Sequence, residues 1–377
     1  MKIKSIELKK ILNSKNEETV EVTVNNIFKG SCGGDGVLNT NVKEFFSNEI
    51  SINQLSKILN NGLYNFNVES LKDILEIENI LLSYDRTNDL SKIGSSVLLA
   101  LEFALLKLVS NNNVLEFLNK KPDHVPVHIC NFFAVNYNEK KEKGQEIMLI
   151  PKGENFKDNV FANSYIYKKI KELIKKDDKS YDGSFISNQK IENILFYLEK
   201  ITNEATKKLG IEFSFGLNLD SKTIFKDEIY SLGKKKFTIS EYLNEINRLI
   251  NRFDIEYLED PLDISNINHT GKIKADYICG DRIFNGNLEN IKKYAKYFNC
   301  ALIKINEVGS LGRLKKIVSF CKGNDINIVL GQALGETNDK IVSEICVGFE
   351  FDFIKYNVYG KERILKLNEL KKIEQSL

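Results

Sequence analysis

Oxygen-bearing side chains follow three apolar segments in the second half of the chain. The segments end in Asn218-Leu219-Asp220, Glu259-Asp260-Pro261 and Gly280-Asp281-Arg282. One acid after an apolar segment is usually a solvated loop residue, but three successive segments that end this way favour a metal site. All-oxygen ligation favours Mg²⁺ over zinc or copper. We expect the ion to be held by Glu259, Asp281 and an oxygen of either Asn218 or Asp220.

Two lysines lie within apolar segments further along the chain. Lys304 is part of Leu302–Asn306, and Lys355 is part of Phe353–Tyr356. Burial of an unpaired lysine is costly, and it lowers the lysine pKa toward the range useful to a base. The alternative is that one or both side chains extend into solvent from the end of the segment. We prefer buried lysines, because a base beside a divalent cation can abstract a proton α to a carboxylate.

Eight short apolar segments separated by other patterns are the elements that must position these residues. They are Val125–Asn131, Glu146–Ile150, Phe213–Leu219, Ile255–Leu258, Tyr277–Cys279, Ala301–Ile305, Ile326–Leu330 and Phe351–Lys355. Helical patterns separate the last six, whereas the first two are close neighbours. This order predicts a β/α barrel with an irregular start. In such a barrel, functional residues lie at the C-terminal ends of the strands, where the acids and lysines above occur.

The first 123 residues have a different pattern. Residues 2–9 and 18–28 are strand-like and predict a hairpin. From about residue 42 to 118, apolar residues recur every three or four positions, which predicts helices. The segment Lys121–His124 breaks this periodicity. We therefore expect an α+β domain over residues 1–123 and a barrel domain over residues 124–377.

Composition excludes several classes of function. The 377 residues include 54 basic and 52 acidic side chains, so the net charge of +2 gives no electrostatic case for nucleic-acid binding. No apolar run reaches the roughly 18 residues that a membrane span needs. Six scattered cysteines favour reduced thiols in the cytoplasm over a disulfide framework. Only three histidines are present, which argues against a histidine-rich zinc site.

Several segments resemble the enolase family. Leu302–Leu311 resembles the segment around the enolase catalytic base, and Tyr257–Leu262 and Cys279–Arg282 resemble two metal-ligand segments. The C-terminal stretch from Ile354 is also similar, as is the glycine-containing loop Lys29–Gly34. The resemblance implies an α/β fold with a small α+β N-terminal capping domain and a ββαα(βα)₆ barrel. It also implies a Mg²⁺-dependent homodimer that converts 2-phosphoglycerate to phosphoenolpyruvate in glycolysis.

The same resemblance implies roles for individual residues. Lys304 corresponds to the base, and Lys355, Glu146 and Asp182 correspond to other catalytic positions, with Asp182 at the place of the general acid. The expected substrate-binding positions are Gln145, Cys32 of the flexible loop, Tyr137 of a second mobile loop, and Gln332. Asp182 is one methylene shorter than the glutamate of the family, and Asn218 stands where enolases have an aspartate.

The loop after the seventh barrel strand departs most from the family. Enolases have Ser-His-Arg-Ser-Gly-Glu-Thr, whereas this chain has Gly331-Gln-Ala-Leu-Gly-Glu-Thr337. Ala333 and Leu334 therefore replace the arginine and serine that hold the substrate phosphate. Charge-assisted hydrogen bonds contribute roughly 1.5–3 kcal/mol each, so their loss lowers phosphate affinity by powers of ten.

Three functions remain open on this sequence. The first is a divergent enolase that binds phosphate through other residues, and the second is a related enzyme that acts on a different carboxylate, either non-phosphorylated or differently phosphorylated. The third is a non-catalytic scaffold or binding protein. A scaffold needs neither Lys304 nor the acids Glu259 and Asp281, so we prefer a Mg²⁺-dependent carbon–oxygen lyase (a hydro-lyase) that acts on a small carboxylate.

Overall fold

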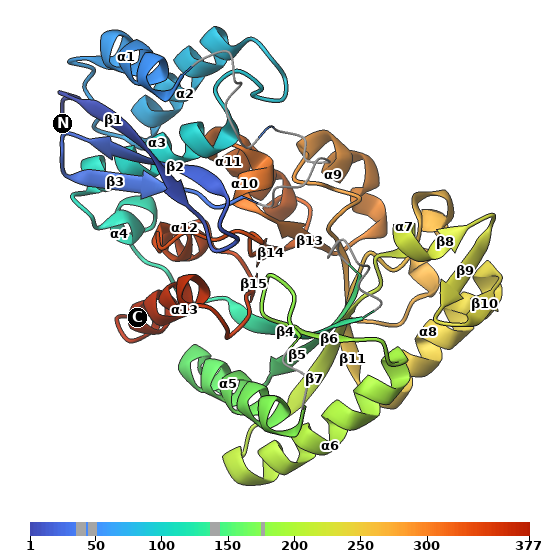
Figure 1. Ribbon diagram of the computed structural model, residues 1–377. Coiled ribbons are helices and arrows are strands. Elements are labelled where there is room, and N and C mark those ends of the chain that lie inside the picture. Colours follow the sequence, from blue (N-terminus) through green and yellow to red (C-terminus); the bar gives the residue numbers. More distant parts are fainter. Residues whose placement is uncertain (35–42, 44–50, 136–143, 175–177) are drawn as a thin grey trace.

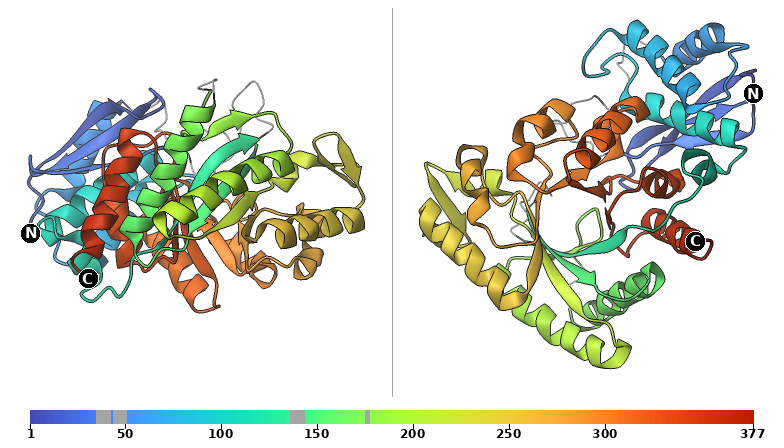
Figure 2. Two further views of the ribbon diagram at one scale, coloured as in Figure 1. Left: turned by 90° about the horizontal axis from the view of Figure 1, so that it is seen from below. Right: turned by 180° about the vertical axis from the view of Figure 1, so that it is seen from behind.

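The computed structural model describes residues 1–34, 43, 51–135, 144–174 and 178–377. Figure 1 shows a small N-terminal domain beside a barrel of strands and helices. Both views in Figure 2 place the N-terminal domain on the side of the barrel opposite to the small β8–β9–β10 sheet. No helix among the described residues is both long and apolar enough to cross a membrane.

The N-terminal domain contains a three-stranded antiparallel sheet. Its strands are β1 (Ile6–Leu12), β2 (Glu18–Val24) and β3 (Phe28–Ser31), and its helices are α1 (Ile52–Leu63), α2 (Leu71–Asp85), α3 (Ser95–Ser110) and α4 (Val114–Leu118). The strand expected over residues 18–28 is interrupted, because Asn25 and Asn26 adopt positive φ angles of 55° and 58° and form a turn. Asparagine tolerates this left-handed conformation better than most residues, so a hairpin forms where one strand was predicted.

The apolar helix α3 packs closely against this sheet. A Cβ atom added to Gly30 of β3 would lie 2.1 Å from the Ala100 carbonyl oxygen. Only glycine allows the strand and the helix backbone to approach this closely. Most residues of α3 are buried, which explains why its sequence is apolar on nearly every side.

The second part of the chain forms a closed barrel of eight strands. Its strands are β4 (Val127–Val135), β5 (Gln145–Pro151), β7 (Phe213–Asn218), β11 (Ile255–Glu259), β12 (Tyr277–Gly280), β13 (Cys300–Ile303), β14 (Asn327–Gly331) and β15 (Phe353–Lys355). They pair in this order, and β15 pairs with β4 to close the ring. The short strand β6 (Phe185–Ser187) pairs with β4 outside the ring. The predicted fold class is confirmed.

Helices follow the strands as the sequence predicted, except that a 3₁₀ segment takes the place of an α-helix between β11 and β12. They are α5 (Phe156–Leu173), α6 (Ile191–Leu209), α7 (Ser221–Ile224), α8 (Ile239–Phe253), α9 (Leu288–Tyr294), α10 (Ile305–Val308), α11 (Leu311–Lys322), α12 (Ile341–Gly348) and α13 (Lys361–Glu374). Two 3₁₀ segments, η1 (Ile264–Lys272) and η2 (Ala295–Tyr297), and the small strands β8 (Phe225–Lys226), β9 (Ile229–Leu232) and β10 (Lys235–Phe237) complete the chain. Two strands followed by two helices and six strand–helix units give the ββαα(βα)₆ arrangement (Figure 1).

The direction of β5 brings its first residues to the functional end of the barrel. This strand is antiparallel to both of its neighbours, β4 and β7, whereas the remaining pairs of the ring are parallel. Its register places Glu146 opposite Asn218, the last residue of β7. Gln145 and Glu146 therefore lie beside the C-terminal ends of the parallel strands, although they begin their own strand.

The N-terminal domain is joined to the barrel by polar contacts. The backbones of Gly34 and Gly335 exchange two hydrogen bonds of 2.8 Å each. At the start of α11, Glu78 accepts hydrogen bonds from Ser310 Oγ at 2.7 Å and from the Gly312 backbone at 2.8 Å. Acidic side chains are favourable at a helix N-terminus because the first N–H groups have no partner within the helix. These contacts hold the N-terminal domain against the loops at one end of the barrel.

Candidate active site

Lys355, at the end of β15, connects two strands through their carboxylates. Its Nζ atom lies 2.6 Å from Glu146 Oε2, and 3.0 and 2.8 Å from the two carboxylate oxygens of Glu259. Only 6% of Lys355 is exposed, so the alternative of a solvated lysine is wrong. Burial would lower the pKa of Lys355, but the charges of Glu146, Glu259 and Asp281 outweigh it and raise this pKa above its usual value. The expected lowering is therefore wrong for Lys355, because the side chain is buried together with acids.

Lys304, at the end of β13, has carboxylate partners of its own. Its Nζ atom lies 3.2 Å from Asp281 Oδ1 and 2.9 Å from Glu307 Oε1. Only 5% of Lys304 is exposed, so it is also not a solvated lysine. The sequence did not single out Glu307, which is brought to Lys304 by the first turn of α10. The position i+3 on this short helix was the signal that could have identified it.

Asn218 connects the same carboxylates that Lys355 contacts. Its Nδ2 donates to Glu259 Oε1 at 2.6 Å and to Glu146 Oε2 at 3.0 Å. Its Oδ1 accepts a hydrogen bond of 2.9 Å from the backbone N–H of Asp220. The amide is held in this orientation because the opposite one would turn its oxygen toward two carboxylates.

Asp220 lies beyond the end of β7 and adopts a left-handed conformation with φ of 42°. The alternation of the strand therefore stops before this residue. Asp220 Oδ1 lies 3.0 Å from Arg282 Nε, so the carboxylate forms an ion pair with the residue after Asp281. This pair links the ends of β7 and β12.

Negative charge is in excess around these strand ends. Burial, together with the charges of Asp281 and Glu146, raises the pKa of Glu259 to about 8 against the opposing effect of Lys355. Burial and the charge of Asp281 also raise the pKa of Asp260 to about 6. Buried carboxylates that are close enough to disfavour each other's ionisation are chemically suited to a cation.

The residue types at this position fit Mg²⁺, which prefers carboxylate and carbonyl oxygens. Register places Glu259 between Asn218 on β7 and Cys279 on β12, two residues before Asp281. Within the ranges that the structure describes, however, no group of three or more histidine, cysteine, aspartate or glutamate side chains is arranged to hold a metal ion.

Asp182 is the centre of a second network in the site. It accepts hydrogen bonds from Asn131 Nδ2 at 2.9 Å, Gln332 Nε2 at 3.2 Å and the Ser184 hydroxyl at 2.6 Å, as well as from Ser180. Burial would raise the pKa of Asp182, but the hydrogen bonds from Ser180 and Ser184 hold it below its usual value. An ionised carboxylate accepts protons and cannot donate one, so this geometry does not suit the general-acid role that the family resemblance implied.

Asn131 joins this network to the lysine network. Its Nδ2 donates both to Asp182 and to Glu146 Oε1, the latter at 3.1 Å. The sequence contained one signal for this residue, since an asparagine within the apolar strand β4 is unexpected unless its amide has partners. We did not predict it because its partners are far away in sequence.

Arg363 of α13 holds the loop after β14. It is almost fully buried and donates to Gln332 Oε1 at 2.9 Å, to the Ala333 carbonyl at 3.2 Å and to the Leu334 carbonyl at 3.0 Å. Glu336 Oε1 accepts from the Ala333 N–H at 3.0 Å. The backbone of this loop is therefore engaged by the protein itself. The role of Arg363 could not be predicted, because it depends on how the last helix meets this loop.

Cys32 and Gly33, in the segment that resembles the flexible loop of enolases, lie against the loop after β14. A Cβ atom added to Gly33 would lie 2.3 Å from the Gly335 carbonyl oxygen, so the two backbones are in direct contact. Cys32 and Ala333 line a small cavity of about 20 Å³ between the loops. Gln145 is also buried at this end of the barrel. Tyr137, the remaining predicted substrate-binding residue, lies outside the described residues.

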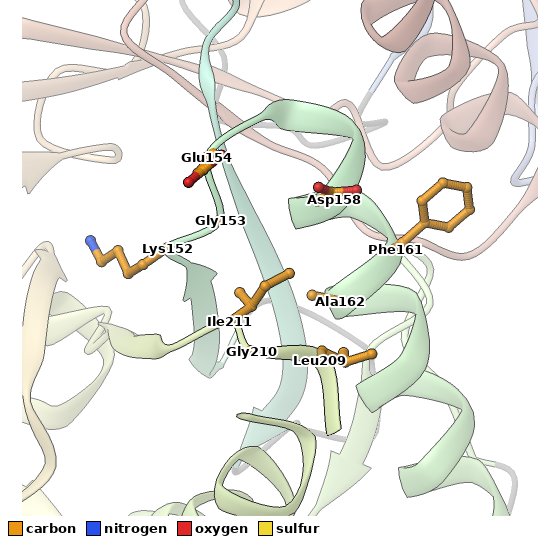
Figure 3. Close-up of a pocket in the computed structure, with 9 residues that line it drawn as sticks. All are labelled: Lys152, Gly153, Glu154, Asp158, Phe161, Ala162, Leu209, Gly210 and Ile211. Atoms are coloured by element: carbon orange, nitrogen blue, oxygen red, sulfur yellow. The ribbon is translucent and has the colours of Figure 1, made fainter. Parts of the chain in front are cut away.

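A larger pocket has a volume of about 540 Å³, and Figure 3 shows the residues that line it. It is formed by the residues that follow β5, by α5 and by the end of α6, and its lining includes Lys152, Asp158, Phe161 and Leu209. None of the predicted site residues that the structure describes lines it. Since Lys152 follows the antiparallel strand β5, this pocket lies away from the lysines and acids described above.

Comparison with known proteins identifies the family. The family model described as "Enolase, C-terminal TIM barrel domain" matches residues 124–377. The chain belongs to the enolase family. All six cysteines of this enolase-family protein are free, as the sequence predicted, and all six are buried.

Curated relatives support an enolase-like function at low identity. The enolase of Methanothermobacter thermautotrophicus is 27% identical over 405 residues, which cover 100% of this chain and 97% of that protein. The enolase of Archaeoglobus fulgidus is 28% identical over 321 residues, covering 81% and 80% of the two chains. The enolase of Ehrlichia ruminantium is 27% identical over 416 residues, covering 100% and 97%. The similarity extends beyond the barrel into the N-terminal domain.

Proposed function

We propose that this protein is an enolase-like, Mg²⁺-dependent lyase that removes the α-proton of a carboxylate and then eliminates water. The observation that carries the proposal is the pair of buried lysines, Lys304 and Lys355, at one end of the barrel with acids from neighbouring strands around them. The relatives named enolase support this reaction class. The default substrate is 2-phosphoglycerate.

Each lysine has a distinct part in the proposed reaction. Lys304 takes the α-proton, and Glu307, 2.9 Å from its Nζ, is positioned to exchange that proton. Lys355, whose Nζ lies 2.6 Å from Glu146, binds the substrate carboxylate through its ammonium group. Mg²⁺, held by Glu259, Asp281 and an oxygen of Asn218 or Asp220, would supply positive charge opposite the developing negative charge on the substrate.

The leaving hydroxyl group must gain a proton to depart as water, and of the two carboxyl groups beside Asn131 we propose Glu146 as its donor, because Asp182 is held ionised by Ser180 and Ser184. Glu146 contacts both Lys355 and Asn131, so it connects the charge of the lysine to the second network. Asp182 holds Gln332 by a hydrogen bond of 3.2 Å and thereby fixes the loop after β14. We propose Gln145, Cys32, Tyr137 and Gln332 as the substrate-binding residues, with Tyr137 assigned from the family resemblance alone.

A second candidate substrate is a small carboxylate without a phosphate group. Ala333 and Leu334 offer no cationic side chain, and the carbonyl groups of both residues are already bound by Arg363. Both candidates use the same base and the same acids. They differ only in what the loop after β14 must bind. A scaffold that does no chemistry is the third candidate.

Formation of phosphoenolpyruvate from 2-phosphoglycerate, followed by ultraviolet absorbance in excess Mg²⁺, tests the proposal. We expect turnover that is slow and that depends on Mg²⁺. A range of small carboxylates with a hydroxyl group on the β-carbon should be assayed in parallel for loss of the α-proton in D₂O. Absence of both turnover and exchange with every substrate would leave only the scaffold.

The proposal extends to the organisation and assembly of the chain. We propose domains over residues 1–123 and 124–377, and a cytoplasmic homodimer, as the family resemblance implies. The six free cysteines are compatible with a reducing compartment. Sedimentation equilibrium measures the assembly, and limited proteolysis tests the boundary, which should give a fragment that begins near residue 124.

A further inference from the structure

Glu259 already has protein donors on both of its carboxylate oxygens. Oε1 accepts from Asn218 Nδ2 at 2.6 Å and from Lys355 Nζ at 3.0 Å. Oε2 accepts from Lys355 Nζ at 2.8 Å and from the Tyr257 hydroxyl at 3.0 Å. A carboxylate offers about four acceptor positions, and these four contacts occupy all of them. A metal ion can reach Glu259 only if at least one of these donors leaves.

Lys355 is the donor that carries charge. Its ammonium lies within 3.0 Å of both Glu146 and Glu259, so its positive charge offsets part of the negative charge of these two carboxylates. Only 6% of Lys355 is exposed, so water does not compete effectively for its hydrogen bonds. The side chain thus supplies a positive charge from within the chain.

Asn218 makes this arrangement possible. Its amide donates to Glu259 and Glu146 at 2.6 and 3.0 Å, a role that an aspartate at this position cannot fill. An aspartate would instead add a third carboxylate beside the other two, and one ammonium would not balance three acids. Asn218 therefore favours Lys355 over a divalent ion as the partner of Glu259.

The geometry points to competition between Lys355 and a divalent cation for Glu259, with Asn218 weakening the binding of the ion. In the absence of a divalent ion the ammonium occupies the carboxylate, and binding of the ion displaces it. The inference rests on the proposed function only in that Mg²⁺ is the ion which that function requires. It concerns the affinity of the site and does not depend on the identity of the substrate.

Mg²⁺ titration by calorimetry on the full chain tests the competition. The informative variants are Asn218→Asp, which adds a ligand charge, and Lys355→Met, which removes the competing ammonium. Matched controls are Asn112→Asp, at an exposed asparagine, and Lys340→Met, at an exposed lysine that pairs with Glu369. The mid-point of thermal unfolding with and without Mg²⁺ gives a second, independent readout of binding.

We expect each of the two site variants to bind Mg²⁺ at least tenfold more tightly than the wild type, because ligand charge count sets the affinity of such sites. The controls should bind as the wild type does. Lys355→Met leaves Glu146 and Glu259 without their ammonium partner. If this variant does not fold, the affinity of Asn218→Asp alone tests the competition. Unchanged affinity in folded Asn218→Asp would overturn the inference.

The competition and the proposed function are tested by different measurements, so either can fail without the other. Proton exchange by the wild type with any carboxylate supports that function even if the titration shows no competition. Tighter Mg²⁺ binding by Asn218→Asp supports the competition even if no substrate is turned over.

Discussion

Glu146 lies directly opposite Asn218 across the antiparallel pair of β5 and β7, and the two side chains form a hydrogen bond of 3.0 Å. If β5 ran parallel to its neighbours, its first residues would lie at the other end of the barrel. The reversed strand therefore adds Gln145 and Glu146 to a site that is otherwise built from strand ends. Lys355 and Asn131 each have Glu146 as one of two carboxylate partners, beside Glu259 and Asp182 respectively.

The loop after β14 gives a prediction about phosphate. The double substitution Ala333→Arg with Leu334→Ser should raise the specificity constant for 2-phosphoglycerate by about tenfold or more, because an arginine and a hydroxyl add charge-assisted hydrogen bonds to phosphate. Steady-state formation of phosphoenolpyruvate at saturating Mg²⁺ measures this change. Leu334→Ser alone is the control, since it adds no charge.

The opposite result has a clear meaning. A wild-type protein that already turns over 2-phosphoglycerate at ordinary enolase rates would show that other residues hold the phosphate. Arg282, which follows Asp281 and pairs with Asp220, would then be the first basic residue to substitute.

The close packing of Gly30 against α3 predicts a loss of stability on substitution. Gly30→Ala places a methyl group 2.1 Å from the Ala100 carbonyl oxygen, so the strand or the helix must move. We expect the free energy of unfolding to fall by about 1–3 kcal/mol. Urea denaturation measures it. The control is Gly62→Ala in α1, where no atom lies within 4 Å of the new methyl group.

The control substitution should not lower the free energy of unfolding. Alanine is favoured over glycine inside a helix, so Gly62→Ala should leave the free energy of unfolding unchanged or raise it by up to about 1 kcal/mol. Equal losses for both substitutions would mean that the loss at Gly30 does not come from contact with α3.

His128 predicts a dependence of stability on pH. It is buried between the Tyr356 carbonyl at 2.9 Å and Asn163 Nδ2 at 3.1 Å, and burial lowers its pKa to about 4. The unfolded chain has the usual value near 6.5, so below that pH it binds more protons than the folded chain. The contribution of His128 to the free energy of unfolding is therefore lost as the pH falls from about 6.5 toward 4.

The size of this effect follows from the two pKa values. Between pH 7 and pH 5 the wild type should lose about 2 kcal/mol of unfolding free energy through His128, and His128→Gln should not show this loss. Urea denaturation at both pH values measures the difference. His124→Gln, at an exposed histidine, should behave as the wild type, and an equal loss in all three proteins would exclude His128 as the cause.

The fold was largely predictable because its signals are local. Apolar segments and helical periodicity identified the eight barrel strands, and the short connection between the first two predicted the irregular start. The turn at Asn25 and Asn26 was missed, because both residues lie within a strand-like pattern. A strong β pattern was assumed to continue where two asparagines could reverse the chain.

The burial of the two lysines was predictable from the sequence, but their contacts were not. Lys304 and Lys355 were expected to be buried, and they are. The raised pKa of Lys355 could not be anticipated, because it depends on Glu146 from a strand about two hundred residues earlier. Arg363 and Asn131 were not predicted for the same reason, since their partners come together only when the barrel closes.

The central claim is that Lys304 removes an α-proton, and hydrogen–deuterium exchange tests it directly. The α-proton signal of 2-phosphoglycerate or another accepted carboxylate is followed by ¹H NMR in D₂O with excess Mg²⁺, for the wild type, Lys304→Ala and the surface control Lys340→Ala. The account predicts exchange by the wild type and the control, and a rate at least about 10²-fold lower for a folded Lys304→Ala protein. Exchange by Lys304→Ala at the wild-type rate would contradict it.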